Sequence, residues 1–285
     1  MDIKTRICLP LLWKIEKHMK MPPHPFNEKG DIWENLYLWQ YKTTEKTLKH
    51  FNIDFSGKVV MDVGCGTGGK SAYLANVADT VIGIDINPHS IAKGRKLIQK
   101  HHPEISHKVI LRVDNAYNLN QPDNSIDIIF MDDVWEHIQK PSKALKEAIR
   151  ITKPGGYILI AFPPLNHPWA AHVNDLIPIP WIHYCLWEKY IVRWYIYKAL
   201  KIPNGIERLK FKGIKPTDKT ITYINHMTLQ RTLAIIHKYK DYVDINDFSY
   251  DLLKVPFAKL FSKIDRIGLF FFSKYYFTLR KREDL

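Results

Sequence analysis

Short apolar runs alternate with longer mixed stretches through the middle of the chain. Five such runs lie between residues 57 and 164, and turn-forming or acidic residues bound them. The first reads Val59 to Val63, and the last follows the turn Pro154-Gly155-Gly156. Runs of this length are typical of buried strands, and the intervening stretches are long enough for helices. The pattern predicts an α/β fold with a parallel sheet and right-handed crossovers over residues 57–162.

The pattern changes on both sides of this core. Residues 1–56 include the amphipathic segment Asp31–Phe51, which predicts a helix within an N-terminal helical cap. Residues 163–221 form an insert rich in aromatic and basic residues, and residues 222–285 return to strand-like apolar runs. A chain of 285 residues suits one elaborated domain, so we expect the last segment to complete the core sheet.

Aromatic residues recur three or four positions apart within the insert: Trp181, Tyr184, Trp187, Tyr190, Trp194 and Tyr197. This spacing predicts one helix with an aromatic stripe. Three interpretations stay open at this point. The stripe packs on the core, lines an apolar pocket as a lid, or lies in a membrane interface beside Lys and Arg. Charged residues in its middle exclude a membrane-spanning helix.

A glycine turn follows the first apolar run, in the order Gly64-Cys65-Gly66-Thr67-Gly68-Gly69. Three of these glycines satisfy the pattern G-x-G-x-x-G, which seats a pyrophosphate in dinucleotide-binding proteins. Asp62, two residues before the turn, argues against that ligand because a carboxylate repels an anion in a partly desolvated site. It favours a ligand with an ammonium group and no phosphate, and S-adenosylmethionine is such a ligand.

Three further carboxylates follow the next predicted strands. Asp85 ends the second strand, where its two oxygens can accept hydrogen bonds from ribose hydroxyls. Asp114 follows the third strand and can accept from an adenine amino group. Asp132 ends the fourth strand. Because the carboxyl ends of parallel strands meet at one edge of a sheet, we expect these acids to surround one site.

The stretches DVGCGTG, GIDIN, DNAYNLNQPDNSIDIIF, EHI and EAIRITKPGGYILI together resemble a class I S-adenosylmethionine-dependent methyltransferase of the methyltransferase 11 type. The resemblance covers about residues 57–164 and, less distinctively, the segment Tyr223–Tyr239, which resembles the helix before the sixth strand. It implies a doubly wound, Rossmann-like sheet of seven strands, mostly parallel, with an antiparallel last strand at Tyr275–Lys281. It also implies a helical substrate lid at residues 163–221.

The same resemblance assigns roles to the cofactor-binding residues. It implies that Gly64, Gly66 and Gly68 line the methionine part of S-adenosylmethionine, and that Asp132 faces the sulfonium side. It implies that Asp85 and Ile86 hold the ribose and adenine. Asp114, Asn115 and Ala116 are expected to border the adenine.

Methyl transfer to an oxygen or acidic carbon also requires removal of a proton. His137 is the first candidate base because the ordinary pKa of imidazole lies near neutrality, although it could equally pack or cap the next helix. Trp135, His167, His172 and Trp181 are candidate substrate-binding residues, with ordinary core packing as the alternative for Trp135. No histidine or cysteine spacing matches a strong metal-binding pattern, so we expect no metal.

These residues favour a small or lipid-like acceptor, with O-methylation ahead of C-methylation. The sequence MDDVWEHI after the fourth strand lacks the Pro-Pro-Tyr pattern of enzymes that methylate nucleobase amino groups. Two alternatives stay open. The basic insert could bring a nucleic acid or glycan to the site, or the chain could be a cofactor-binding module that docks to a partner or a membrane.

The net charge of +13 is concentrated outside the predicted cofactor core. Residues 163–221 carry +5 and residues 222–285 carry +4, whereas residues 57–162 carry only +2. Such surfaces can attract an anionic membrane or nucleic acid, or can simply keep a protein soluble. Three cysteines without framework spacing fit a reducing cytoplasm. The short apolar run Ile7–Trp13 is a poor signal peptide, so we expect a cytoplasmic protein with at most peripheral membrane contact.

Overall fold

A single mixed sheet of seven strands organises the protein. The computed structural model describes residues 3–219, 224–264 and 267–284. The strands lie in the order β3-β2-β1-β4-β5-β7-β6 across the sheet. Their bounds are β1 Val59–Val63, β2 Thr80–Asp85, β3 Val109–Val113, β4 Ile126–Asp132, β5 Thr152–Phe162, β6 Val243–Leu252 and β7 Phe272–Lys281.

Strand β7 is the antiparallel member of the sheet. It lies between β5 and β6 and pairs antiparallel with both, whereas β1 to β5 pair in parallel with one another. The predicted doubly wound α/β fold with an antiparallel last strand is therefore confirmed. The last strand begins three residues before the predicted Tyr275 and ends at the predicted Lys281.

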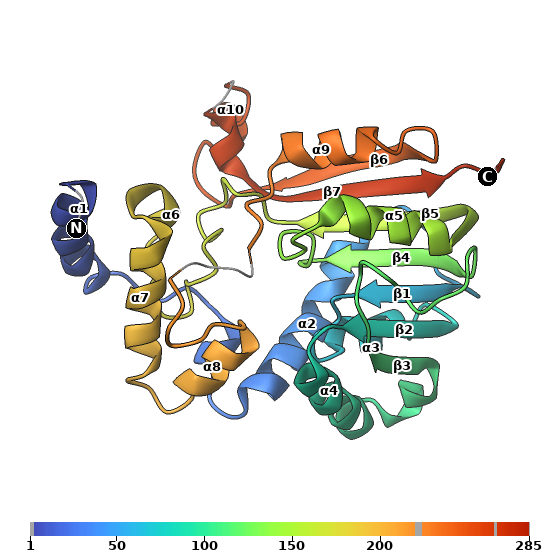
Figure 1. The fold of residues 1–285 in the computed structure, drawn as a ribbon, viewed down its shortest axis with the longest axis horizontal. Helices are drawn as coiled ribbons and strands as arrows, with labels where there is room; N and C mark the ends of the chain where they lie inside the picture. The colour runs from blue at the N-terminus through green and yellow to red at the C-terminus, as the bar shows by residue number, and fades with distance from the viewer. Residues whose placement is uncertain (1–2, 220–223, 265–266, 285) are drawn as a thin grey trace.

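Helices cover both faces of the sheet (Figure 1). Their bounds are α1 Ile3–Glu16, α2 Ile32–Leu48, α3 Gly69–Leu74, α4 Pro88–His101, α5 Pro141–Ile151, α6 Ile182–Cys185, α7 Glu188–Ala199, α8 Gly205–Phe211, α9 Leu229–His237 and α10 Ala258–Phe261. Short 3-10 turns lie at Pro25–Asn27, Pro103–Lys108 and Gly268–Phe271. Helix α9 falls within the segment predicted to precede the sixth strand, whose first residue, Tyr223, lies outside the described residues.

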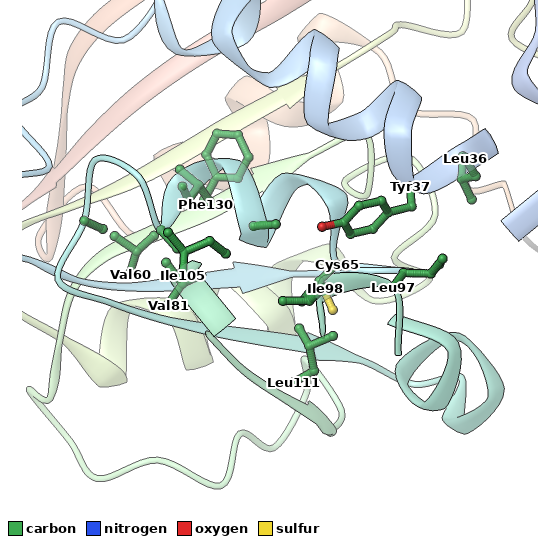
Figure 2. Packing of buried hydrophobic residues seen from close by; sticks show 14 of the residues in the cluster. Leu36, Tyr37, Val60, Cys65, Val81, Leu97, Ile98, Ile105, Leu111 and Phe130 are labelled. Carbon is green, nitrogen blue, oxygen red and sulfur yellow. The ribbon is translucent and has the colours of Figure 1, made fainter. Parts of the chain in front are cut away.

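Two hydrophobic clusters follow from the twofold periodicity of the strands. Val60 and Phe130 point to the face covered by α2, α3 and α4, where Tyr37 and Leu97 pack (Figure 2). Met61, the residue after Val60 in β1, belongs to the cluster on the opposite face, which α5 and α9 cover. Alternate residues of a buried strand face opposite layers, which explains why these runs are apolar throughout.

The N-terminal region divides between two parts of the molecule. Helix α2 begins after Asp31, whose side chain accepts a hydrogen bond from the amide of Trp33, and it packs on the sheet layer. Helix α1 instead contacts the insert, where Trp13 lies against Trp194 with 6.2 Å between ring centroids. The N-terminal helices expected to form one cap thus pack against different neighbours.

The prediction of one aromatic helix in the insert is wrong. The chain breaks between α6 and α7, because Leu186 and Trp187 are extended. Of the predicted stripe only Trp194 lies on the buried face of α7, beside Ile191, Val192 and Tyr195, while Trp187 and Tyr197 are more than half exposed. Helical spacing located the aromatic residues but did not reveal which face the rest of the insert would cover.

A third hydrophobic cluster gives the insert its own core, and a buried charge cluster contacts this core through Tyr195. Asp175 has no exposed surface and pairs with Arg208 at 3.3 Å and Lys212 at 3.4 Å. The Tyr195 hydroxyl donates a further hydrogen bond to it at 2.8 Å. Burial favours the neutral acid, but the two cations and the Tyr195 hydrogen bond hold the pKa of Asp175 below its usual value. Among the described residues, no helix is long and apolar enough to cross a membrane.

Candidate functional site

The glycine turn lies between β1 and α3, at the carboxyl end of the parallel strands. The amides of Gly64 and Cys65 both donate to the carbonyl of Ile84, at 2.8 and 2.9 Å, which pins the turn against the end of β2. Gly64 has a φ of +74°, and a Cβ there would lie 2.2 Å from a methyl group of Val134. A side chain is therefore excluded both by conformation and by space.

Asp85 holds the glycine turn from the neighbouring strand. Its two carboxylate oxygens accept from the amides of Gly66 at 3.0 Å and Asn87 at 2.8 Å. Burial raises the pKa of Asp85, and these two hydrogen bonds oppose the shift. Each carboxylate oxygen can accept a second hydrogen bond, so this geometry leaves capacity for a diol. Ile86, the next residue, is 72% exposed and offers an apolar surface beside it.

Asp114, Asn115 and Ala116 form the next turn along this edge. The amide of Asp114 donates to the carbonyl of Asp85 at 3.2 Å, so the two predicted cofactor segments meet. The Asp114 carboxylate accepts from the amides of Asn115 and Asn120 at 2.8 and 3.1 Å. It therefore shapes its own turn and places Asn115 at the exposed rim.

Asp62 lies beneath the glycine turn rather than on its surface. Its side chain is 1% exposed and accepts a hydrogen bond from the Ser71 hydroxyl at 2.6 Å. Burial raises the pKa of Asp62 to about 6, while the Ser71 hydrogen bond and the charge of Lys70 limit the rise. With this pKa the carboxylate is mostly ionised at neutral pH.

Two lysines missed in the sequence analysis neutralise the acids at the end of β4. Lys70 Nζ lies 2.6 Å from Asp132 Oδ2 and 3.0 Å from Asp133 Oδ2. Lys274 pairs with Asp132 and lies 2.6 Å from Asp133 Oδ1. Burial favours the neutral forms, but the opposite charges dominate, so the pKa of both lysines is raised and that of Asp133 is lowered. Lys70 follows the glycine turn directly, whereas nothing in the local sequence marks Lys274.

Glu136, His137 and His172 converge beside this charged group. His137 Nε2 lies 3.8 Å from Glu136 Oε1, and the His137 and His172 rings meet edge to face at 4.9 Å between centroids. Both Glu136 oxygens are buried and have no hydrogen-bond partner among the described residues. Burial and the neighbouring Asp133 raise the pKa of Glu136 well above its usual value. The three side chains join the end of β4 to the insert.

The same three side chains are a donor set that could hold a metal ion. Their candidate ligand atoms lie within 4.8 Å of one another. In the described part of the chain, no other group of three or more His, Cys, Asp or Glu side chains has this spacing. Local sequence spacing could not indicate it, because His172 belongs to the insert. Asp175, which the sequence places near His172, is instead turned toward Arg208 and Lys212.

The remaining predicted substrate residues fall in two environments. Trp135 has no exposed surface, and its indole N–H donates to the Thr232 hydroxyl at 3.1 Å, so in this structure it packs in the core. His167 and Trp181 lie in the first part of the insert, where the Trp181 indole donates to the carbonyl of Asn166 at 2.8 Å. Burial lowers the pKa of His167 to about 4 and that of His172 well below its usual value.

Comparisons with known proteins agree with this geometry. A family model described as a methyltransferase domain matches residues 61–160. The 2-methyl-6-phytyl-1,4-hydroquinone methyltransferase of Synechocystis sp. is 31% identical over 138 residues, covering 48% of this chain and 38% of that protein. The tocopherol O-methyltransferase of Arabidopsis thaliana is 34% identical over 130 residues, covering 42% and 37%. The chain thus spans less than two fifths of the length of these relatives.

Solved structures share the fold over most of the chain. A geranyl diphosphate methyltransferase in complex with S-adenosylmethionine has a TM-score of 0.54 at 13% identity, covering 90% of this chain and 94% of that one. The [4+2]-cyclase SpnF has the same TM-score at 16% identity, covering 85% and 80%. At such identities the similarity concerns the fold alone, and the cyclase illustrates that this fold serves more than one reaction.

Proposed function

We propose that this chain, which belongs to the class I S-adenosylmethionine-dependent methyltransferase family through residues 61–160, transfers a methyl group from S-adenosylmethionine to a small or lipid-like acceptor. The observation that carries the proposal is the meeting of the glycine turn, Asp85 and Asp114 at one edge of the sheet. This edge is where open α/β sheets bind their ligands.

The cofactor fits this edge by charge and by hydrogen-bond capacity. The glycine turn takes the methionine part, and Asp62 beneath it attracts the ammonium group through its charge. Asp85 accepts from the ribose hydroxyls, while Ile86 and the turn Asp114–Ala116 border the adenine. Asp132 faces the sulfonium side, where its pairing with Lys70 and Lys274 leaves the group close to neutral.

The chemical step needs positioning and removal of one proton. S-adenosylmethionine supplies an activated methyl group when it is bound. With the cofactor held there, its methyl group would pass to an acceptor oxygen as the bond to sulfur breaks, and His137 would take the proton of the acceptor. Glu136, 3.8 Å from His137 Nε2, lies where it can orient the imidazole. His172 and His167 border the acceptor from the insert, with Trp181 behind them.

The names of the relatives support a lipid-like acceptor over a polymer. They include a 2-methyl-6-phytyl-1,4-hydroquinone methyltransferase and a tocopherol O-methyltransferase, and the name of one structural neighbour gives geranyl diphosphate, so each name gives a small acceptor. We favour O-methylation and place C-methylation second. A nucleic acid or glycan acceptor on the basic insert is the alternative enzyme activity. We further propose a cytoplasmic location with peripheral contact to an anionic membrane surface, because such an acceptor partitions into lipid.

The test begins with cofactor binding and ends with transfer. Calorimetry of the purified chain should show binding of S-adenosylmethionine and none of NAD. Isotope-labelled S-adenosylmethionine, supplied with lipid extracts, hydroquinones or RNA, should then label an organic-soluble product. Label found in RNA would refute the lipid-like acceptor and support the alternative, a nucleic acid acceptor. Cofactor binding without any labelled product would indicate a binding module, and NAD binding instead of S-adenosylmethionine would refute the assignment.

A further inference from the structure

The connection between β6 and β7 carries an unusual surface. Residues 252–264, here called the docking segment, contain three lysines and no acidic residue. The segment includes the short helix α10, which projects from the body of the protein at the top of Figure 1. A basic, apolar element that stands away from the core suggests contact with something outside the chain.

Large apolar side chains dominate the exposed surface of this segment. Phe257 is 71% exposed and Leu260 is 63% exposed, and Val255 and Ile264 are also exposed. Phe257 has a φ of +61°, a backbone conformation that bulky residues rarely adopt. The segment is nevertheless anchored from behind, because the ring of Phe261 stacks on that of Phe271 at 5.3 Å.

The docking segment lies at the same end of the sheet as the proposed acceptor site. It begins at Leu252, the last residue of β6, and precedes β7, whose Lys274 pairs with Asp133. Phe270, just after the segment, lies 5.4 Å from the ring of Tyr184 in the insert. A surface that contacts the segment is therefore also next to the insert that borders the acceptor.

We propose that the docking segment binds the surface of an anionic lipid bilayer, with Phe257 and Leu260 entering the headgroup and acyl boundary and Lys254, Lys259 and Lys263 facing lipid phosphates. The proposal rests on the lipid-like acceptor proposed above. It adds which part of the protein would contact the membrane that contains this acceptor. Charge decides the occupant, because a second copy of a chain with a net charge of +13 is repelled by this basic segment, whereas an anionic bilayer attracts it.

Vesicle flotation tests the proposal without acceptor or cofactor. The full chain should float with vesicles of phosphatidylcholine and phosphatidylglycerol, and less with phosphatidylcholine alone. The double variant Phe257→Ser/Leu260→Ser should lower the partition coefficient by about tenfold or more, because the apolar side chains supply insertion energy. The triple variant Lys254→Gln/Lys259→Gln/Lys263→Gln should weaken binding and flatten its dependence on salt.

Ile110→Ser is the matched control, because Ile110 is 52% exposed on β3 at the opposite edge of the sheet. It should leave flotation unchanged, and circular dichroism should show that all variants stay folded. Equal flotation of wild type and the double variant would overturn the proposal. So would a dimer in sedimentation that the double variant abolishes while vesicle binding is absent. Loss of methyl transfer with normal flotation would instead count only against the proposed function.

Discussion

Lys274, near the start of β7, lies 2.6 Å from Asp133, which follows the end of β4. The two residues are 141 positions apart in the chain. Lys274 also pairs with Asp132, and Lys70 completes a group of two cations and two anions at the sheet edge. This group ties the antiparallel strand to the floor of the proposed methyl-transfer site. Its charges compensate one another where neither lysine is well exposed to water.

Replacing Lys274 tests how much this charged group contributes to the stability of the fold. Lys274→Met should lower the free energy of unfolding by about 3 kcal/mol, because it leaves two carboxylates, one of them buried, to share the single cation Lys70. Denaturant unfolding measures the change. Lys46→Met is the matched control: Lys46 pairs with Asp251 at 2.6 Å but is 65% exposed, so its loss should cost less than about 1 kcal/mol. Similar losses for the two variants would contradict the role given to burial.

Asp85 should determine cofactor affinity more than stability. Asp85→Ala removes a charged acceptor from the ribose site, and hydrogen bonds to charged groups contribute roughly 1.5–3 kcal/mol each. We therefore expect affinity for S-adenosylmethionine to fall by about tenfold to a hundredfold in calorimetry. Asp79→Ala, an exposed acid before the other end of β2, serves as the control and should leave affinity unchanged. Unaltered binding by Asp85→Ala would remove this residue from the cofactor site.

The pKa of Asp62 predicts how cofactor binding depends on pH. Its folded-state pKa is raised from 3.8 to about 6, so the carboxylate is charged above that pH and becomes neutral below it. Attraction of the cofactor ammonium group should accordingly weaken as the pH falls through about 6. Asp62→Asn should bind more weakly at neutral pH and lose this titration, while still accepting the Ser71 hydrogen bond. A wild-type affinity that stays flat across this pH range would refute electrostatic attraction by Asp62.

His137 should affect the chemical step while leaving cofactor binding intact. General bases typically contribute a factor of roughly 10² to 10⁴ to the rate, so His137→Gln should lower kcat by about that range with an identified acceptor. Its affinity for S-adenosylmethionine should not change. Glu136→Gln keeps the shape of the buried side chain and should give a smaller loss with an altered pH profile. An unimpaired kcat for His137→Gln would leave only a packing role for the residue.

The local pattern of the sequence was sufficient to predict that the glycine turn, Asp85 and Asp114 meet at one edge of the sheet. The glycine turn and Asp114 follow short, mainly apolar runs and Asp85 ends another, and a parallel sheet brings the carboxyl ends of its strands to one edge. The same logic predicted the antiparallel last strand only with the help of family resemblance. No residue in Phe272–Lys281 indicates by itself that the strand inserts between β5 and β6.

Other features depended on contacts between distant segments. Helical spacing predicted one aromatic helix, but packing of the insert on its own core buried Tyr195 and left Trp187 exposed. The meeting of His137 with His172, and of Lys274 with Asp133, joins segments that no local periodicity relates. The sequence by itself determined the glycine turn and the succession of strands and helices along the core. Both depend on local features, namely backbone conformation and the alternation of apolar and polar stretches. Only the tertiary structure decided which charges compensate and which faces are covered, because burial is a property of the assembled chain.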